Sequence, residues 1–207
     1  MKLFTAVALV LTLASLSTAP APAAPTERVV LAGGCFWGMQ AVFESLRGVT
    51  RAVAGYSGGN AATAHYEIVS TGMTGHAESV EVTYDPSKIS FDQLLDVYFT
   101  VAHDPTQLNR QGPDDGTQYR SEIFYTTPAQ HAQAVAYIGR LERSKVYSAP
   151  IVTKLAPLTG FYPAESYHQE FLVHNRDNPY IVANDLPKLQ ELHQKYPQLV
   201  KPNAPSP

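Results

Sequence analysis

Residues 28–38 read Arg28-Val29-Val30-Leu31-Ala32-Gly33-Gly34-Cys35-Phe36-Trp37-Gly38. The apolar run predicts a short strand over 28–32, and the glycine pair that follows allows a tight turn. Gly48 fits the end of a helix that begins after this turn. The apolar face of that helix recurs at helical spacing, at Met39, Val42, Phe43 and Leu46.

Cys35 is the only cysteine of the chain, and the neighbouring Trp37 is its only tryptophan. The free N–H groups and the positive dipole end of a helix N-terminus favour a thiolate. Phe36 and Trp37 would place a large apolar wall beside that thiolate. The alternative is a small buried hydrophobic residue, the role of many free cysteines.

The rest of the chain alternates strands and helices in the order β-α-β, then β-α-β, with additions. This order predicts an α+β fold, a ferredoxin-like two-layer sandwich of helices on a mixed sheet, with long irregular loops. Segments 60–75 and 157–179 are expected to be mostly irregular. The further strands are expected over 49–56, 78–84, 119–125 and 151–155, and the further helices from Ser90, over 128–145 and over 186–196.

Three regions differ in composition. Residues 1–24 hold Lys2, an apolar run from Leu3 to about Leu16, and then Ala21-Pro22-Ala23, which is typical of a cleaved signal peptide. The alternative is a retained anchor or tail, although the run is too short for an ordinary membrane span. Residues 25–196 form the expected domain, and the proline-rich residues 197–207 are expected to be disordered. A signal peptide would place the protein in the periplasm or outside the cell.

Composition excludes several classes of function. The chain has 207 residues, a formal net charge of −3 and no basic stripe, which argues against a nucleic-acid partner. Its seven histidines show no zinc-ligand spacing, so no metal site is expected. No phosphate-binding glycine motif follows the first strand. The absence of sustained heptads favours a monomer.

Glu78 begins the apolar side of the strand expected over 78–84. Alternation places Glu78 on one face with Val80, Val82 and Tyr84. A carboxyl group among apolar side chains has a raised pKa and acts as a general acid near neutral pH. The alternative is an ordinary carboxylate at the edge of a sheet.

Three functions therefore remain open from the residues themselves. Cys35 and Glu78 suit a thiol-dependent oxidoreductase, but a hydrolase or acyltransferase with a Cys-His pair needs no sequence proximity of its partners. A binding module with a buried thiol is the third possibility. Among the twelve tyrosines, Tyr66 and Tyr119 lie in polar loops where a hydroxyl can bind a ligand oxygen.

Several blocks of the chain together resemble the peptide methionine sulfoxide reductase A family. The resemblance covers about residues 28–175 in order and without large gaps. The blocks are Gly33–Gly38, Gly55–Gly59, Thr74–Glu78, His103–Pro105, Asp115–Ser121 and Phe161–Glu165.

The resemblance implies reduction of the S epimer of methionine sulfoxide, either free or in oxidised proteins and peptides. By its motifs, Cys35 is the expected nucleophile. Phe36 and Trp37 are the expected pocket for the methyl group of the substrate. Glu78 is the expected acid that protonates the sulfoxide oxygen, and Cys35 becomes a sulfenic acid as methionine leaves.

The resemblance also assigns the polar surroundings of the substrate. Tyr66 and Tyr119 are expected to bind the sulfoxide oxygen, and Asp114 to orient the substrate backbone. No bound cofactor is implied.

The chain departs from many of these relatives because it lacks the further cysteines that reduce the sulfenic acid through a disulfide. Its C-terminal residues 201–207 contain none. We therefore expect an external thiol to recycle Cys35, from a thioredoxin, a glutaredoxin or a small thiol. Gln40 stands where relatives often carry Glu, and we expect it to lie away from the chemistry.

Overall fold

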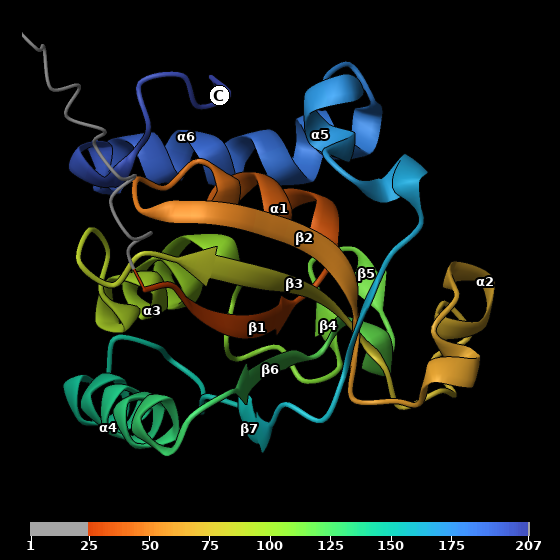
Figure 1. Cartoon of the computed structure of the whole chain (residues 1–207), viewed down its shortest axis with the longest axis horizontal. Coiled ribbons are helices and arrows are strands. Elements are labelled where there is room, and N and C mark those ends of the chain that lie inside the picture. Colours follow the sequence, from red (N-terminus) through yellow and green to blue (C-terminus); the bar gives the residue numbers. More distant parts are fainter. Residues whose placement is uncertain (1–24, 207) are drawn as a thin grey trace, which may run out of the picture.

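A mixed sheet of six strands lies at the centre of this computed structural model, which describes residues 25–206 (Figure 1). All neighbouring strands are antiparallel except β6 and β7, which are parallel. The α+β class and the mixed sheet are therefore confirmed. The strands, in the order in which they lie across the sheet, are β7 (Lys154–Pro157), β6 (Ser121–Tyr125), β1 (Glu27–Gly33), β3 (Ala77–Tyr84), β2 (Val49–Ser57) and β8 (Phe161–Pro163).

The four central strands carry the predicted β-α-β-β-α-β pattern. Helix α1 (Phe36–Glu44) joins β1 to β2, and α3 (Phe91–Val97) lies between β3 and β6. Val29, Leu31 and Val80 of the sheet share one buried cluster with apolar side chains of both helices. Strands β7 and β8 extend the sheet beyond the four strands of the predicted ferredoxin-like pattern.

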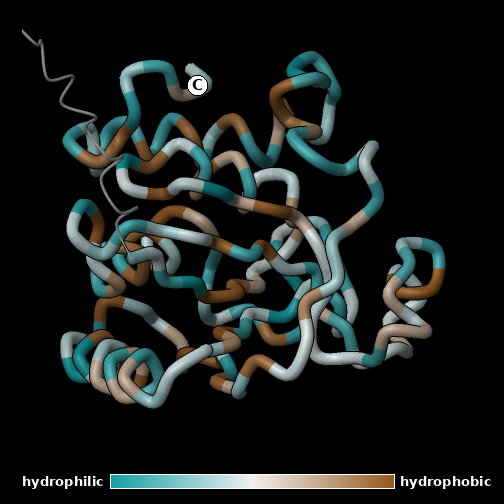
Figure 2. Tube along the Cα trace, in the orientation of Figure 1, coloured by the Kyte–Doolittle hydropathy of each residue, from teal (hydrophilic) through white to brown (hydrophobic). Residues whose placement is uncertain are grey.

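Local sequence signals set the helix ends. At the start of α3, the Gln93 N–H donates to Ser90 Oγ at 3.2 Å and the Ser90 N–H donates to Gln93 Oε1 at 2.9 Å. This is the predicted capping box. Helix α4 (Pro128–Ser144) lies beside α3, and α6 (Leu186–Lys195) lies along α1 (Figure 1). Hydrophilic and hydrophobic residues alternate along α4 and α6, as expected of helices with one buried face (Figure 2).

Short elements occur where irregular chain was expected. The segments 60–75 and 157–179 contain α2 (Tyr66–Val69), β8 and α5 (Phe171–His174). These elements of three or four residues are too short to produce a periodic pattern. A small hairpin, β4 (Arg110–Gln111) with β5 (Asp114–Asp115), forms in the polar loop before β6.

Two strand boundaries also differ from those expected. Strand β7 begins at Lys154 rather than Ile151, because its parallel register starts with Lys154 opposite Glu122. Tyr119 lies in a 3₁₀ turn (Thr117–Tyr119), and β6 begins after it at Ser121. Both boundaries depend on long-range pairing that a local pattern does not contain.

The expected disorder of residues 197–207 is not what the structure shows through residue 206. Leu199 and Val200 are buried, and Val200 pairs with Leu46. The Lys201 N–H donates to the Ser45 carbonyl at 2.8 Å. Two apolar side chains among the prolines cover the end of α1, and this burial offsets the cost of ordering the segment.

The expected signal peptide, residues 1–24, lies outside the described residues. Within residues 25–206, no helix has the length and apolar character needed to cross a bilayer.

Candidate active site

Cys35 lies at the junction between β1 and α1, where it is the N-cap residue of the helix. Gly34 turns the chain there with a φ of 89°, and a Cβ at this position would lie 2.6 Å from the Gln111 side chain. The turn therefore requires glycine for both conformation and space. Cys35 itself is only 8% exposed.

A cavity of about 170 Å³ opens onto Cys35. We call it the aromatic cavity. It brings together every residue that the sequence assigned to the site, although these residues come from distant parts of the chain. Tyr180 is the one further residue of its lining. The lining consists of Cys35, Phe36, Trp37, Tyr66, Glu78, Asp114, Tyr119 and Tyr180.

Glu78 is a buried carboxyl group at the start of β3, as its place in the strand predicts. It is 3% exposed, and its Oε2 accepts a hydrogen bond from the Phe36 N–H at 3.1 Å. Burial raises the pKa of Glu78 to about 8, with the Phe36 N–H partly opposing and the charge of Asp114 adding to the rise. Glu78 therefore carries a proton at neutral pH and is able to donate it.

The thiol of Cys35 behaves differently from the sequence-based expectation. Burial raises the pKa of Cys35 well above its ordinary value, and Glu78 and Asp185 raise it further. The Trp37 backbone N–H and Lys188 act in the opposite direction. Desolvation outweighs the helix N-terminus here, so the site at rest holds a thiol rather than a thiolate.

Tyr66 and Tyr119 bring two hydroxyl groups to the cavity from separate turns. Tyr66 begins α2, and its N–H donates to Glu165 Oε1 at 3.0 Å, which anchors the turn. Burial, reinforced by the charge of Glu78, raises the pKa of both tyrosines. The hydroxyls therefore stay protonated and are able to donate hydrogen bonds to a ligand oxygen.

Tyr180 is a member of the site that the sequence did not single out. Its hydroxyl donates to Asp114 Oδ2. Burial raises the pKa of the Asp114 carboxyl, and this hydrogen bond partly opposes the rise. Tyr180 follows Asn178-Pro179 in a stretch without periodicity, so the sequence carries no local signal that would have separated it from the other tyrosines.

Trp37 forms a wall whose orientation is fixed from two sides. Its ring stacks on Phe171 with centroids 3.8 Å apart and an interplanar angle of 12°. Its Nε1–H donates to Nδ1 of the buried His168 at 3.1 Å. His168 is a second residue that the sequence did not single out. Its Nδ1 must carry no proton in order to accept this hydrogen bond.

A second cavity of about 130 Å³ also reaches Cys35. We call it the polar cavity. It shares three residues with the aromatic cavity, and amide and lysine side chains form much of the rest. The lining consists of Cys35, Gln107, Gln111, Gly112, Pro113, Asp114, Tyr180, Asn184 and Lys188.

The buried carboxyl of Asp185 connects this region to α1. Its Oδ1 accepts a hydrogen bond from Lys188 Nζ at 3.1 Å. A Cβ at Gly38 would lie 2.1 Å from the same oxygen. The missing side chain of Gly38 is therefore what lets Asp185 and Lys188 approach the helix that begins beside Cys35.

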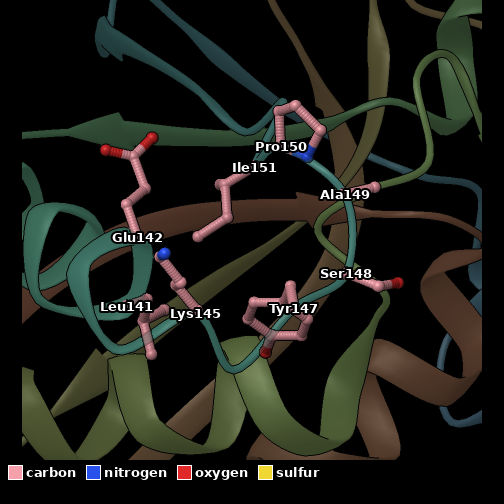
Figure 3. Close-up of a pocket in the computed structure, with 8 residues that line it drawn as sticks. All are labelled: Leu141, Glu142, Lys145, Tyr147, Ser148, Ala149, Pro150 and Ile151. Carbon is pink, nitrogen blue, oxygen red and sulfur yellow. The ribbon is translucent and has the colours of Figure 1, made fainter.

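A further cavity among residues 25–206 has no cysteine in its lining. A cavity of about 300 Å³ lies between the end of α4 and the segment 147–151, with Glu142 and Lys145 at its side (Figure 3). None of its lining residues lines either cavity at Cys35. Within residues 25–206, no group of three or more His, Cys, Asp or Glu side chains has the arrangement of a metal site.

Several known proteins to which this chain is similar are methionine sulfoxide reductases. Residues 27–200 match the family described as peptide methionine sulfoxide reductase. The reductase MsrA 2 of Mesorhizobium japonicum is 58% identical over 178 residues, which cover 86% of this chain and 91% of that protein. MsrA 2 of Synechocystis sp. is 52% identical over 176 residues, which cover 85% of this chain and 82% of that protein.

Solved structures agree. Methionine sulfoxide reductase A of Corynebacterium diphtheriae aligns with a TM-score of 0.65 and 37% identity, covering 73% of this chain and 76% of that one. Reduced Mxr1 of Saccharomyces cerevisiae aligns with a TM-score of 0.69 and 32% identity, and the alignment covers 74% of this chain and 87% of that one. Mxr1 has also been solved in complex with Trx2, an alignment at 22% identity that shows the fold alone. The chain belongs to the peptide methionine sulfoxide reductase family and is a peptide-methionine (S)-S-oxide reductase.

Proposed function

We propose that this reductase repairs oxidised proteins and peptides through a cycle that uses one cysteine. Methionine (S)-sulfoxide, free or in a protein, oxidises Cys35 to a sulfenic acid, and an external thiol then reduces it. The observation that carries the proposal is the pairing of a buried thiol and a protonated Glu78 in one aromatic cavity, in a chain with no second cysteine.

The sulfoxide step follows from this pairing. Glu78 donates its proton to the sulfoxide oxygen, which makes the sulfur electrophilic, and Cys35 Sγ attacks that sulfur. The sulfur–sulfur bond formed by this attack and the bond from the methionine sulfur to oxygen then break as the oxygen bonds to Sγ, and the thiol proton returns to Glu78. The substrate sulfur gains two electrons, and Cys35 loses them as it becomes a sulfenic acid.

The remaining cavity residues would bind the substrate. Tyr66 and Tyr119 donate hydrogen bonds to the partially negative sulfoxide oxygen and hold it in place while Glu78 protonates it. Phe36 and Trp37 receive the methyl group, because an apolar wall favours it over water. Asp114 orients the substrate backbone, with Tyr180 holding its carboxyl in place.

The geometry gives no support to a hydrolase with a Cys-His pair. The described residues that line the two cavities at Cys35 include no histidine. Such a mechanism needs a base within hydrogen-bonding reach of the thiol.

The external thiol is proposed to come from a thioredoxin-type protein. No intrachain disulfide is possible with one cysteine. The complex of the relative Mxr1 with Trx2 supports this class of reductant. A glutaredoxin and a small thiol are the alternatives, and an assay with each reductant distinguishes them.

We also propose that the protein is a monomer and that residues 1–24 form a signal peptide that directs its export. N-terminal sequencing and cell fractionation would test the signal peptide.

The cycle is tested by one turnover without reductant. We expect the S epimer to add about one oxygen mass (~16 Da) to Cys35 by mass spectrometry, with one methionine released per protein. The R epimer should give neither product. Methionine formation that persists in Cys35→Ser, or a disulfide-linked dimer in place of the oxygen adduct, would overturn the proposal.

A further inference from the structure

The polar cavity gives Cys35 a second opening that the sulfoxide step does not use. It shares Cys35, Asp114 and Tyr180 with the aromatic cavity. Because the hydrogen-bonded pair Asp114–Tyr180 lines both cavities, this pair stands between them. One opening of Cys35 is aromatic and acidic, and the other is lined by amides and carries a cation.

Lys188 is that cation. Among the described residues that line either cavity, it is the only one with a positive side chain. Its Nζ donates to Asp185 Oδ1 at 3.1 Å, and its side chain is 18% exposed. An ammonium group has three N–H donors, so the bond to Asp185 leaves donors for an incoming anion.

The walls of the polar cavity are already in place without a ligand. The Asp104 N–H donates to Gln111 Oε1 at 2.9 Å, and Gln111 Nε2 donates to the Asp104 carbonyl at 3.0 Å. On the other wall, Asn184 Nδ2 donates to the Tyr180 carbonyl at 3.0 Å. A preformed space of about 130 Å³ suits a small thiol or a single cysteine side chain of a partner, not a folded domain.

The chemistry of the sulfenic acid requires a second approach. An incoming thiolate forms a bond to Cys35 Sγ while the bond from Sγ to oxygen breaks. The thiolate must therefore approach the sulfur away from the departing hydroxyl. That hydroxyl occupies the former place of the sulfoxide oxygen, beside Glu78 in the aromatic cavity.

We propose that the polar cavity is the entry site for the thiol that recycles Cys35, with Lys188 attracting its thiolate. This inference rests on the proposed sulfenic acid cycle. The thiolate forms a mixed disulfide with Cys35, and the hydroxyl leaves as water with a proton from Glu78. A second thiol then attacks the outer sulfur, which releases the external disulfide and returns the Cys35 thiol. Two thiols are thus oxidised as one sulfenic acid is reduced.

The test measures the two half-reactions separately. Methionine formed in a single turnover reports the sulfoxide step, and the loss of Cys35 sulfenic acid after reductant is added reports recycling. Asn184→Phe fills the polar cavity and Lys188→Met removes its charge. We expect recycling to slow about ten-fold more than sulfoxide reduction in each variant. Asn184→Phe blocks the path to Cys35, and Lys188→Met removes a focusing charge that raises the encounter rate by about ten-fold or more.

Two control variants match these changes outside the cavity. Val182→Phe introduces the same side chain at a residue that is 50% exposed, and Lys195→Met removes a lysine from the same helix, where it pairs with Glu191 at 2.6 Å. Both should leave recycling within about two-fold of the wild type.

Dithiothreitol and a thioredoxin distinguish the two sources of the thiol. Slow recycling with both reductants is the expected result, since both must reach Sγ through the same opening. Slow recycling with only one of them assigns the cavity to that source. Equal losses in both half-reactions, or unchanged recycling with both reductants, overturn the entry site. Failure of the wild type to form a sulfenic acid instead overturns the proposed cycle.

Discussion

As the proposed acid, Glu78 sets the pH range in which we expect this reductase to work. Because burial raises its pKa to about 8, Glu78 is a proton donor below that pH and a carboxylate above it. We expect kcat/KM for the S epimer to decline as pH rises through about 8. Glu78→Gln should lower the rate about 10²–10⁴-fold and remove this decline. Glu81→Gln, on the opposite face of β3, is the control, and it should keep both the wild-type rate and its decline with pH.

The same group makes stability depend on pH. The pKa of Glu78 in the folded protein, about 8, lies above its ordinary value of 4.5, so the folded state binds the proton more tightly. The resulting stability is fully present below pH 4.5 and is lost as pH rises to about 8. We therefore expect the melting temperature of the wild type to fall, relative to that of Glu78→Gln, as the pH rises from acidic to alkaline. A difference in melting temperature between the two proteins that stays the same at every pH would contradict a buried acid at Glu78.

The sequence predicted Glu78 because strand alternation is a local property, and one local pattern placed its carboxyl on the buried face. It failed for Tyr180 and His168, since their roles depend on contacts between distant segments. It also predicted the wrong ionisation for Cys35. The helix N-terminus is visible in the sequence, but the burial that outweighs it is produced by the whole fold.

At the scale of elements, the contact between α1 and the start of α6 depends on Gly38. A Cβ there would meet the buried Asp185 carboxyl, which is held by Lys188. We expect Gly38→Ala to lower the free energy of unfolding by about 1–3 kcal/mol, because overpacking outweighs the better helix propensity of alanine. Chemical denaturation measures this change.

Gly139→Ala is the matched control inside α4. The nearest atom to an added Cβ is Arg143 Nη1 at 3.2 Å, the end of a flexible side chain. Here helix propensity acts alone, and we expect a gain of about 1 kcal/mol. If both variants lost stability equally, the specific packing of Gly38 against Asp185 would not explain the result.

Elements with their own signals were predicted, and elements created by pairing were not. The capping box at Ser90 and the long helix α4 follow from nearby residues. Strand β8 exists because Phe161–Pro163 pairs with the edge of β2, and β7 takes its register from β6. No pattern within such short segments specifies a partner.

At the scale of the molecule, the C-terminal segment packs onto the fold and contains no cysteine. Leu199 and Val200 are buried at the end of α1, and the Lys201 N–H is bonded to Ser45. Burial of one such apolar side chain contributes about 1.5–3 kcal/mol. We expect deletion of residues 197–207 to lower the melting temperature by roughly 5–15 °C.

Activity should respond differently from stability. Because the segment contains no cysteine, the truncated protein should still form one Cys35 sulfenic acid per turnover at a temperature well below its melting point. Deletion of residues 205–207 alone is the control, since the bond from Arg176 to the Ser206 carbonyl is a surface contact, and it should leave the melting temperature nearly unchanged. A folded truncation that lost its single turnover would show that the segment acts on the site, whereas an unchanged melting temperature would show that its packing contributes little.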